Sequence, residues 1–200
     1  MIKNRNMLKK EIIYREILTK ALEEKQINFK QLSLAKKFGF SLSTINHALK
    51  PLASIGAIEI GRRGFKLTDI KKALLYWATI RKFDKDIVYS TRMEERISEI
   101  ERSVPASAIY TCYTGYKLLF KDVPADYSEI YFYLPKEDLE EAKQRFPPKK
   151  GPANVSVLNA DQWLRGYKIA PAAQIYVDLW NLKTWYAGDF VKALEERLRI

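Results

Sequence analysis

Cysteine and histidine are almost absent from this chain of 200 residues, because each occurs only once, at Cys112 and His47. A single cysteine excludes a disulfide within the chain, which fits a protein of the reducing cytoplasm. Transition-metal sites usually draw several ligands from these two residue types, so the composition predicts no such site and no cofactor. The composition leaves open a magnesium site formed by carboxylates.

Long hydrophobic runs are also missing. No apolar segment approaches the roughly 20 residues of a membrane span, and no charged segment followed by an apolar one resembles a secretion signal. The chain is 47% hydrophobic and 30% charged, which is typical of a soluble protein with a core. We expect a cytoplasmic protein that does not enter a membrane, built as one large domain or two small ones.

Positive charge is confined to the first part of the chain, although the whole chain has a net charge of +11. Residues 1–83 hold 18 Lys/Arg and 6 Asp/Glu, a net charge of +12, whereas residues 84–200 hold 17 and 18, a net charge of −1. A positive field on one domain attracts polyanions, usually nucleic acid. Solubility or a membrane-surface patch are the alternatives. The prediction is a nucleic-acid-binding domain over 1–83 and a second domain over 84–200.

Helical patterns follow a short basic tail over residues 1–6. Apolar residues at helical spacing predict a helix over 8–22. A second helix is expected to begin with Asn28 as N-cap and to end at Gly39. Its buried side would consist of Phe29, Leu32, Ala35 and Phe38. A third helix is expected after Ser41, whose hydroxyl suits an N-cap, and Pro51 should kink or end it near Lys50. Its inward face would consist of Leu42, Ile45, Leu49 and Leu52.

The outer side of this third helix carries hydrogen-bonding side chains that suit base edges and phosphates in a major groove. Two alternating segments, 57–60 and 65–67, then flank Gly61-Arg62-Arg63-Gly64 and predict a β-hairpin whose arginines reach phosphates or the minor groove. The hydroxyls could instead serve as caps, and His47 as a solvated surface residue. The predicted DNA-binding residues are Ser43, Thr44, Asn46, His47, Lys50, Arg62, Arg63 and Lys66.

Residues 41–60, SLSTINHALKPLASIGAIEI, resemble the recognition helix and first wing strand of prokaryotic winged helix-turn-helix transcriptional regulators. The resemblance implies a regulator that binds double-stranded DNA, although some winged helices bind proteins instead. A fourth helix, opened by Thr68 or Asp69, should close this domain and lead through residues 81–86 into the second one.

The second domain reads as strands alternating with helices, which predicts an α/β arrangement and an α+β chain overall. Strands are expected over 87–89, 108–113, 129–134 and 155–158. One helix is expected to begin at a capping box at Thr91. Further helices are expected over 115–120, from Pro135 to about Arg145, over 171–181 and over 189–200. A loop is expected over 147–152.

One region resembles the active site of nucleotidyltransferases, in which a glycine turn binds phosphate and strand carboxylates hold magnesium. Gly115 would supply the turn, and Asp126 and Glu129 the carboxylates. Tyr116 stands where a small residue is needed, and carboxylates three apart point to opposite faces of a strand. We therefore expect no catalytic residue and no enzyme, and a degenerate nucleotidyltransferase-like domain is one option for this small α/β domain. A nucleotidyltransferase-like enzyme or a protein-interaction module is the alternative.

Residues 170–179 and 188–198 resemble the end of the AbiE-type (type IV) antitoxin family, which joins a winged helix to an α/β domain. The resemblance implies a repressor of its own promoter that counters a partner toxin. Gln174 and Asp178 are expected on the helix surface or as caps. A homodimer would match a palindromic operator, and the second domain would sense, dimerise or bind a protein partner. The aromatic residues there are expected in the core and at half-buried sheet positions, with a partner surface as the alternative. They are Tyr110, Tyr113, Tyr131, Tyr133, Trp163, Trp180 and Trp185.

Overall fold

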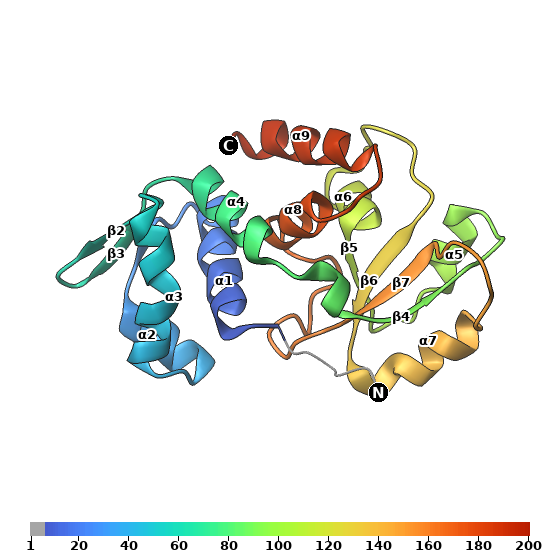
Figure 1. Cartoon of the computed structure of the whole chain (residues 1–200), viewed down its shortest axis with the longest axis horizontal. Coiled ribbons are helices and arrows are strands. Elements are labelled where there is room, and N and C mark those ends of the chain that lie inside the picture. Colours follow the sequence, from blue (N-terminus) through green and yellow to red (C-terminus); the bar gives the residue numbers. More distant parts are fainter. Residues whose placement is uncertain (1–6) are drawn as a thin grey trace.

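The computed structural model describes residues 7–200, and the basic tail expected over residues 1–6 lies outside this range. Within residues 7–200 the chain is an α+β protein with nine α-helices, two 3-10 turns and two small sheets (Figure 1). No helix of these residues is long and apolar enough to cross a membrane.

Four helices and a three-stranded sheet form the first part of the molecule. The helices are α1 (Lys9–Glu23), α2 (Gln31–Phe38), α3 (Leu42–Ser54) and α4 (Ile70–Ile80). The sheet is antiparallel, with β3 (Gly64–Leu67) between β1 (Asn28–Phe29) and β2 (Ile58–Gly61). The apolar stripe of α1 is buried as expected, and Tyr14 on this helix donates a hydrogen bond to the carbonyl of Ala48 in α3 at 2.5 Å.

Three residues of this part do not lie where the sequence analysis expected them. Asn28 lies in β1 rather than at a helix N-cap, because residues 28–29 pair with Phe65 and Lys66 of β3. Leu32 and Leu42, expected inside, are 53% and 46% exposed, and both lie in the first turn of their helix.

Pro51 does not end α3, which continues to Ser54. Leu52, the residue after the proline, is 1% exposed and belongs to the core that α1 and α3 share. Burial of this side chain therefore outweighs the one helical hydrogen bond that proline cannot make.

A four-stranded mixed sheet organises the rest of the molecule. Its order is β4-β7-β6-β5, in which β6 and β7 are parallel and the outer pairs antiparallel. The strands are β4 (Ile87–Thr91), β5 (Ile109–Thr111), β6 (Ile130–Leu134) and β7 (Val155–Asn159). The helices are α5 (Ile97–Ser103), α6 (Cys112–Phe120), α7 (Leu139–Arg145), α8 (Ala172–Trp180) and α9 (Ala187–Leu198). The 3-10 turns are η1 (Phe83–Lys85) and η2 (Lys136–Asp138).

The two faces of this sheet are covered by different helices (Figure 1). Phe132 points to one face and shares a core with Ile100 of α5 and Ala142 of α7. Tyr133, the next residue, points to the other face, into a core with α6, α8 and α9. This alternation is the period of two that a strand between two helical layers requires.

Two boundaries in this part differ from the sequence prediction. Thr91 does not cap a helix but ends β4, where it pairs with Val155 and its hydroxyl donates to the carbonyl of Pro147 at 2.8 Å. Helix α5 begins six residues later, at Ile97. The strand expected over 108–113 ends at Thr111, because Cys112 and Tyr113 open α6.

The two parts share one continuous core. Ile13 of α1 and Trp77 of α4 belong to the same buried apolar cluster as Ile175 and Leu179 of α8. The connecting segment over residues 81–86 is packed as well, because Arg81, Phe83 and Asp86 are all buried. A division into two domains near residue 83 stays a prediction from composition.

Candidate nucleic-acid interface

The exposed side of α3 presents a continuous polar stripe. Ser43, Asn46, His47 and Lys50 are all exposed, while Ile45, Ala48 and Leu49 between them are buried. This separation follows from the helical period of 3.6 residues. Four of the five predicted contact residues of α3 therefore lie together on one exposed face, and Thr44 is the exception.

A local cap fixes where this stripe begins. Gly39 ends α2 in the left-handed conformation, and Ser41 then accepts a hydrogen bond from the backbone N–H of Thr44 at 3.1 Å. The hydroxyls of Ser41 and Thr44 are 2.9 Å apart. Thr44 is half-buried, so its side chain belongs to the cap, and its predicted DNA contact is less favoured than those of the stripe.

The hairpin of β2 and β3 carries Arg62 and Arg63 at its tip. It extends from one end of the molecule, away from the second sheet and next to the helices α2 and α3 (Figure 1). Both arginines are exposed. Two guanidinium groups at the end of an exposed hairpin are suited to bind phosphate oxygens.

Lys66 occupies a different position from these arginines. It lies in the central strand β3 with its side chain outward, directly across from Glu59 of β2 and Asn28 of β1. The carboxylate of Glu59 on the neighbouring strand offsets part of the charge of Lys66. Lys66 is therefore less suited to bind a phosphate than Arg62 and Arg63.

Gly64 has a role that the sequence pattern does not show. A Cβ at this position would lie 2.1 Å from the carbonyl oxygen of Phe29, so only glycine lets β1 approach β3. The rings of Phe29 and Phe65 stack beside this contact, with centroids 5.3 Å apart. The glycine predicted to form the turn thus also holds the third strand in place.

Cations of this face are free of ion pairs, unlike those on α4. Among residues 7–200, no carboxylate pairs with Lys30, Lys50, Arg62 or Arg63, whereas Lys71 and Lys72 pair with Glu195 and Asp69. Lys30 borders a hollow of about 460 Å³ beside the hairpin, together with Arg63 and Lys66. The sequence analysis missed Lys30; its place just before α2, in the basic segment, is the signal that points to it.

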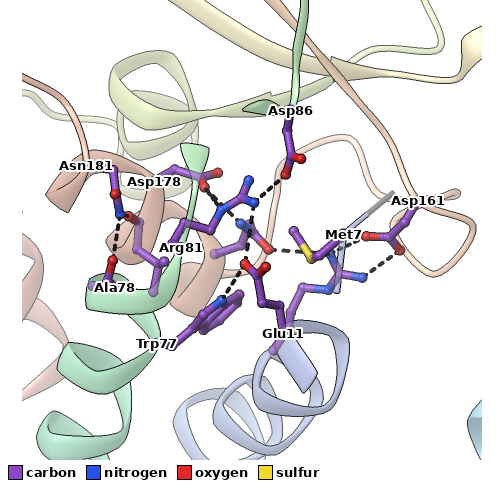
Figure 2. Close-up of polar contacts among 12 residues, drawn as sticks. Met7, Glu11, Trp77, Ala78, Arg81, Asp86, Asp161, Asp178 and Asn181 are labelled. Carbon is purple, nitrogen blue, oxygen red and sulfur yellow. Dashed lines mark hydrogen bonds and ion pairs between the residues drawn. The ribbon is translucent and has the colours of Figure 1, made fainter. Parts of the chain in front are cut away.

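A second candidate region is a buried polar cluster, which consists of Glu11, Trp77, Arg81, Asp86, Thr111, Tyr133, Gln174 and Asp178. Figure 2 shows Arg81 of this cluster with the carboxylates around it. Arg81, the C-cap of α4, lies at its centre and contacts the carboxylates of Glu11 at 3.4 Å, of Asp178 at 3.3 Å and of Asp86. Its Nη2 also donates to the hydroxyl of Tyr133 at 3.0 Å. The cluster therefore joins α1 and α4 to the second sheet and to α8.

Asp178 is the acceptor for three further residues of this cluster. It accepts hydrogen bonds from Thr111 at 2.8 Å, from Tyr133 at 2.6 Å and from the amide of Gln174 at 2.9 Å. Gln174 and Asp178 were expected on the surface of α8, and this was wrong, because both are fully buried. The missed signal is their setting in an otherwise apolar helix, where a polar side chain needs a buried partner.

The buried polar cluster contains no activated nucleophile. Burial alone would lower the pKa of Arg81, but Tyr133 and the carboxylates around it raise this pKa well above its ordinary value, so Arg81 stays charged. Burial and the charge of Asp178 raise the pKa of Tyr133 and of Cys112 well above their usual ranges, so both stay protonated near neutral pH. All these side chains are enclosed, which leaves no access for a ligand.

The nucleotidyltransferase-like arrangement is not formed at Gly115. This residue lies inside α6 rather than in a turn, and a Cβ there would meet the carbonyl oxygen of Tyr110 and the side chain of Ile175 at 3.1 Å. Asp126 and Glu129 lie in the segment before β6, where Glu129 accepts a hydrogen bond from Tyr186. Among residues 7–200, no three His, Cys, Asp or Glu side chains are placed to hold a metal ion.

The aromatic residues of the second part differ in how far their side chains are exposed. Tyr113 and Tyr133 are buried, and the half-buried group consists of Tyr110, Tyr131 and Trp163. Trp180 and Trp185, in contrast, are exposed. The expectation of core and half-buried positions was thus wrong for these two tryptophans, which lie at and after the end of α8.

The two candidate regions differ in what they allow. The stripe of α3 and the hairpin tip are exposed, polar and cationic, whereas the buried polar cluster is closed to solvent and rich in carboxylates. Only the first can meet a macromolecule. In comparisons with protein-family models, with curated proteins and with solved structures, none matched this chain.

Proposed function

We propose that the chain is a sequence-specific regulator that binds double-stranded DNA, and that α1–α4 with β1–β3 act as a winged helix-turn-helix. The proposal rests on the exposed stripe of α3, which lies next to a hairpin that ends in Arg62 and Arg63. Both belong to the part of the chain that holds the excess positive charge. The order of elements, three helices followed by a hairpin, is that of a winged helix.

In this proposal α3 lies in the major groove. Its 13 residues span about 20 Å, and a groove about 12 Å wide admits one helix. Asn46 and His47, in the second turn, would read base edges, because an asparagine amide matches the donor and acceptor of adenine. Ser43 and Lys50 at the two ends would contact flanking bases or phosphates.

The hairpin would hold the adjacent backbone. Arg62 and Arg63 would each neutralise a phosphate and release condensed counterions, which makes the affinity dependent on salt but not on sequence. Lys66 in β3 and Lys30, which lies beside the hairpin at the start of α2, would add a weaker positive field. The second sheet and its helices would serve as the dimerising, sensing or partner-binding part of a cytoplasmic, non-enzymatic regulator. The AbiE-type resemblance supports a repressor of its own promoter.

A binding selection tests the proposal. Duplexes that the full chain retains from a random-sequence pool would be sequenced, and the affinity for the preferred duplex measured by fluorescence anisotropy at several salt concentrations. We expect a shared motif and a dissociation constant that rises steeply with salt. Arg62→Ala/Arg63→Ala should weaken binding to all duplexes and lower the log–log salt slope by about 2, since each phosphate contact contributes about 0.9.

The matched control removes two charges elsewhere. Lys149 and Lys150 are exposed in the loop between α7 and β7, and Lys149→Ala/Lys150→Ala should leave the slope unchanged. An equal slope for the arginine variant and the parent chain would contradict the role of the hairpin. Absence of any salt-dependent duplex binding would contradict the proposal as a whole and favour a winged helix that binds protein.

A further inference from the structure

A hollow of about 620 Å³ lies where the two parts of the molecule meet, and it is separate from the proposed DNA interface. The start of α1 and the turn between α2 and α3 form one wall, and the segment over residues 159–165 forms the other. Its volume lies within the range of small-molecule sites, about 300–1,000 Å³.

One side of the hollow is apolar and aromatic. Met7, Ile12, Phe40 and Trp163 line it. The rings of Phe40 and Trp163 meet edge to face with centroids 5.6 Å apart, and Phe38 supports both from behind. The backbone N–H of Trp163 donates to Asp161 at 2.9 Å, which fixes the segment that carries the indole. Such a wall is suited to a flat ring.

The other side of the hollow is positive. Lys9 and Lys136 line it, both are exposed, and neither forms an ion pair with any residue from 7 to 200. The ammonium of Lys9 lies 5.0 Å from the centroid of the Phe40 ring, so the charge and the aromatic wall are adjacent. A bound molecule would meet both at once.

The one carboxylate in the wall does not neutralise these lysines. Asp161 is buried, and both of its oxygens are held by Arg15, at 2.7 and 2.8 Å. Arg165, a third cation at the rim, is paired with Glu137 at 2.8 Å. The hollow therefore keeps two cations that no neighbouring acid offsets, and it favours an anion.

We propose that this hollow binds a small organic anion with an aromatic ring, the ring on Phe40 and Trp163 and the carboxylate or phosphate group between Lys9 and Lys136. Phe40 directly precedes Ser41, the N-cap of α3, while Trp163 belongs to the second part. An occupied hollow would thus link the second part to the start of α3 and make the anion an effector of DNA binding. The effector role, unlike the binding, rests on the proposed function.

Two anionic probes, benzoate and phenyl phosphate, test the binding and distinguish the carboxylate from the phosphate. Each would be titrated into the full chain while the indole N–H resonance of Trp163 is followed by NMR, with benzyl alcohol as the neutral probe. We expect a saturable shift for at least one anion, weaker at high salt, and binding of benzyl alcohol at least about tenfold weaker. No saturable shift with either anion, or equal binding of benzyl alcohol, would overturn the proposal.

Variants locate the site. Lys9→Gln and Lys136→Gln should each weaken binding of the anion at least about threefold, because each removes one charge next to it. Lys183→Gln, an exposed lysine outside the hollow, is the matched control and should leave binding unchanged. Unchanged binding in a Lys9→Gln/Lys136→Gln chain would place the anion elsewhere and overturn the proposal.

A separate measurement, the affinity for DNA, tests the effector role. The affinity of the full chain for its preferred duplex should change at least about threefold in saturating anion and not at all in the Lys9→Gln/Lys136→Gln chain. An unchanged affinity in the parent chain would overturn the effector role. Because the NMR titration contains no DNA, failure of the binding site and failure of the DNA-binding proposal are distinguishable.

Discussion

Arg81 donates from Nε to the carboxylate of Asp178 at 3.3 Å, and this ion pair joins the end of α4 to the last turn of α8. The two side chains are 1% and 0% exposed. Water cannot replace either partner at that depth, so each charge depends on the protein for its solvation. The helices that present the proposed DNA interface are therefore attached to the rest of the molecule through a buried polar contact as well as an apolar one.

Removal of one partner from this pair should be costly. Arg81→Met leaves Asp178, Asp86 and Glu11 without the guanidinium that they share, and we expect the free energy of unfolding to fall by about 3–5 kcal/mol. Urea unfolding measures the loss. Lys183→Met, which breaks the exposed pair with Asp84, is the control and should change the free energy by less than about 1 kcal/mol. Similar losses in the two variants would contradict the central role of Arg81.

The close approach of β1 to Gly64 predicts a second effect on stability. In Gly64→Ala the new methyl group would collide with the carbonyl oxygen of Phe29, which is backbone and cannot rotate away. We expect a loss of about 1–3 kcal/mol and faster hydrogen exchange at the amide of Leu67, which bonds the carbonyl of Ile27 at 2.8 Å. Gly61→Ala is the control, because its nearest neighbour would be 3.9 Å away. Unchanged exchange at Leu67 would show that β1 does not depend on this glycine.

The N-cap of α4 predicts a pH dependence. Asp69 accepts a hydrogen bond from the backbone N–H of Lys72 at 2.8 Å, which is the main cause that lowers the pKa of Asp69 below its usual 3.8. A carboxyl with a lower pKa in the folded state adds stability above its unfolded pKa and loses it as the pH falls through the folded one. Asp69→Asn keeps a capping acceptor without this titration.

Comparison of the parent chain with Asp69→Asn isolates the contribution of the Asp69 carboxylate to stability. The difference in unfolding free energy between the parent chain and Asp69→Asn should be constant near neutral pH and shrink below about pH 4. Thermal or urea unfolding at several pH values measures it. A difference that stays constant into the acid range would contradict a lowered pKa for this cap.

Local signals predicted most of the first part correctly. The apolar spacing of α1, the cap at Ser41 with Gly39 before it, and the glycines around Arg62 and Arg63 each act within a few residues of chain. Local rules failed where distant contacts compete with them. Thr91 fits a capping box with Glu94, but its pairing with β7 holds it in a strand.

Long-range partners explain what the sequence could not show. Gln174 and Asp178 are four residues apart on α8, but Arg81, the ion-pair partner of Asp178 in the buried polar cluster, is 97 residues from it along the chain. No local pattern links such positions. The strand β1 is equally hidden, because two residues have no periodicity and pair with β3 only through the gap at Gly64.

The middle of the exposed stripe makes the most specific prediction about function. Asn46 and His47 are exposed side by side on the second turn of α3 and are flanked by Ser43 and Lys50. If they read bases, Asn46→Ala should cost about 1–3 kcal/mol on the preferred duplex and relax the preference at one base position. Its salt slope should stay that of the parent chain, because no phosphate contact is lost.

Lys50→Ala provides the contrast to Asn46→Ala on the same helix face. It removes a charge, so it should weaken binding to all duplexes alike and lower the log–log salt slope by about 1. Both variants change only exposed side chains, so the parent melting temperature should be kept, and anisotropy titrations on the preferred and a scrambled duplex separate the two effects. Equal losses for Asn46→Ala on the two duplexes would mean that α3 holds the backbone without reading the sequence.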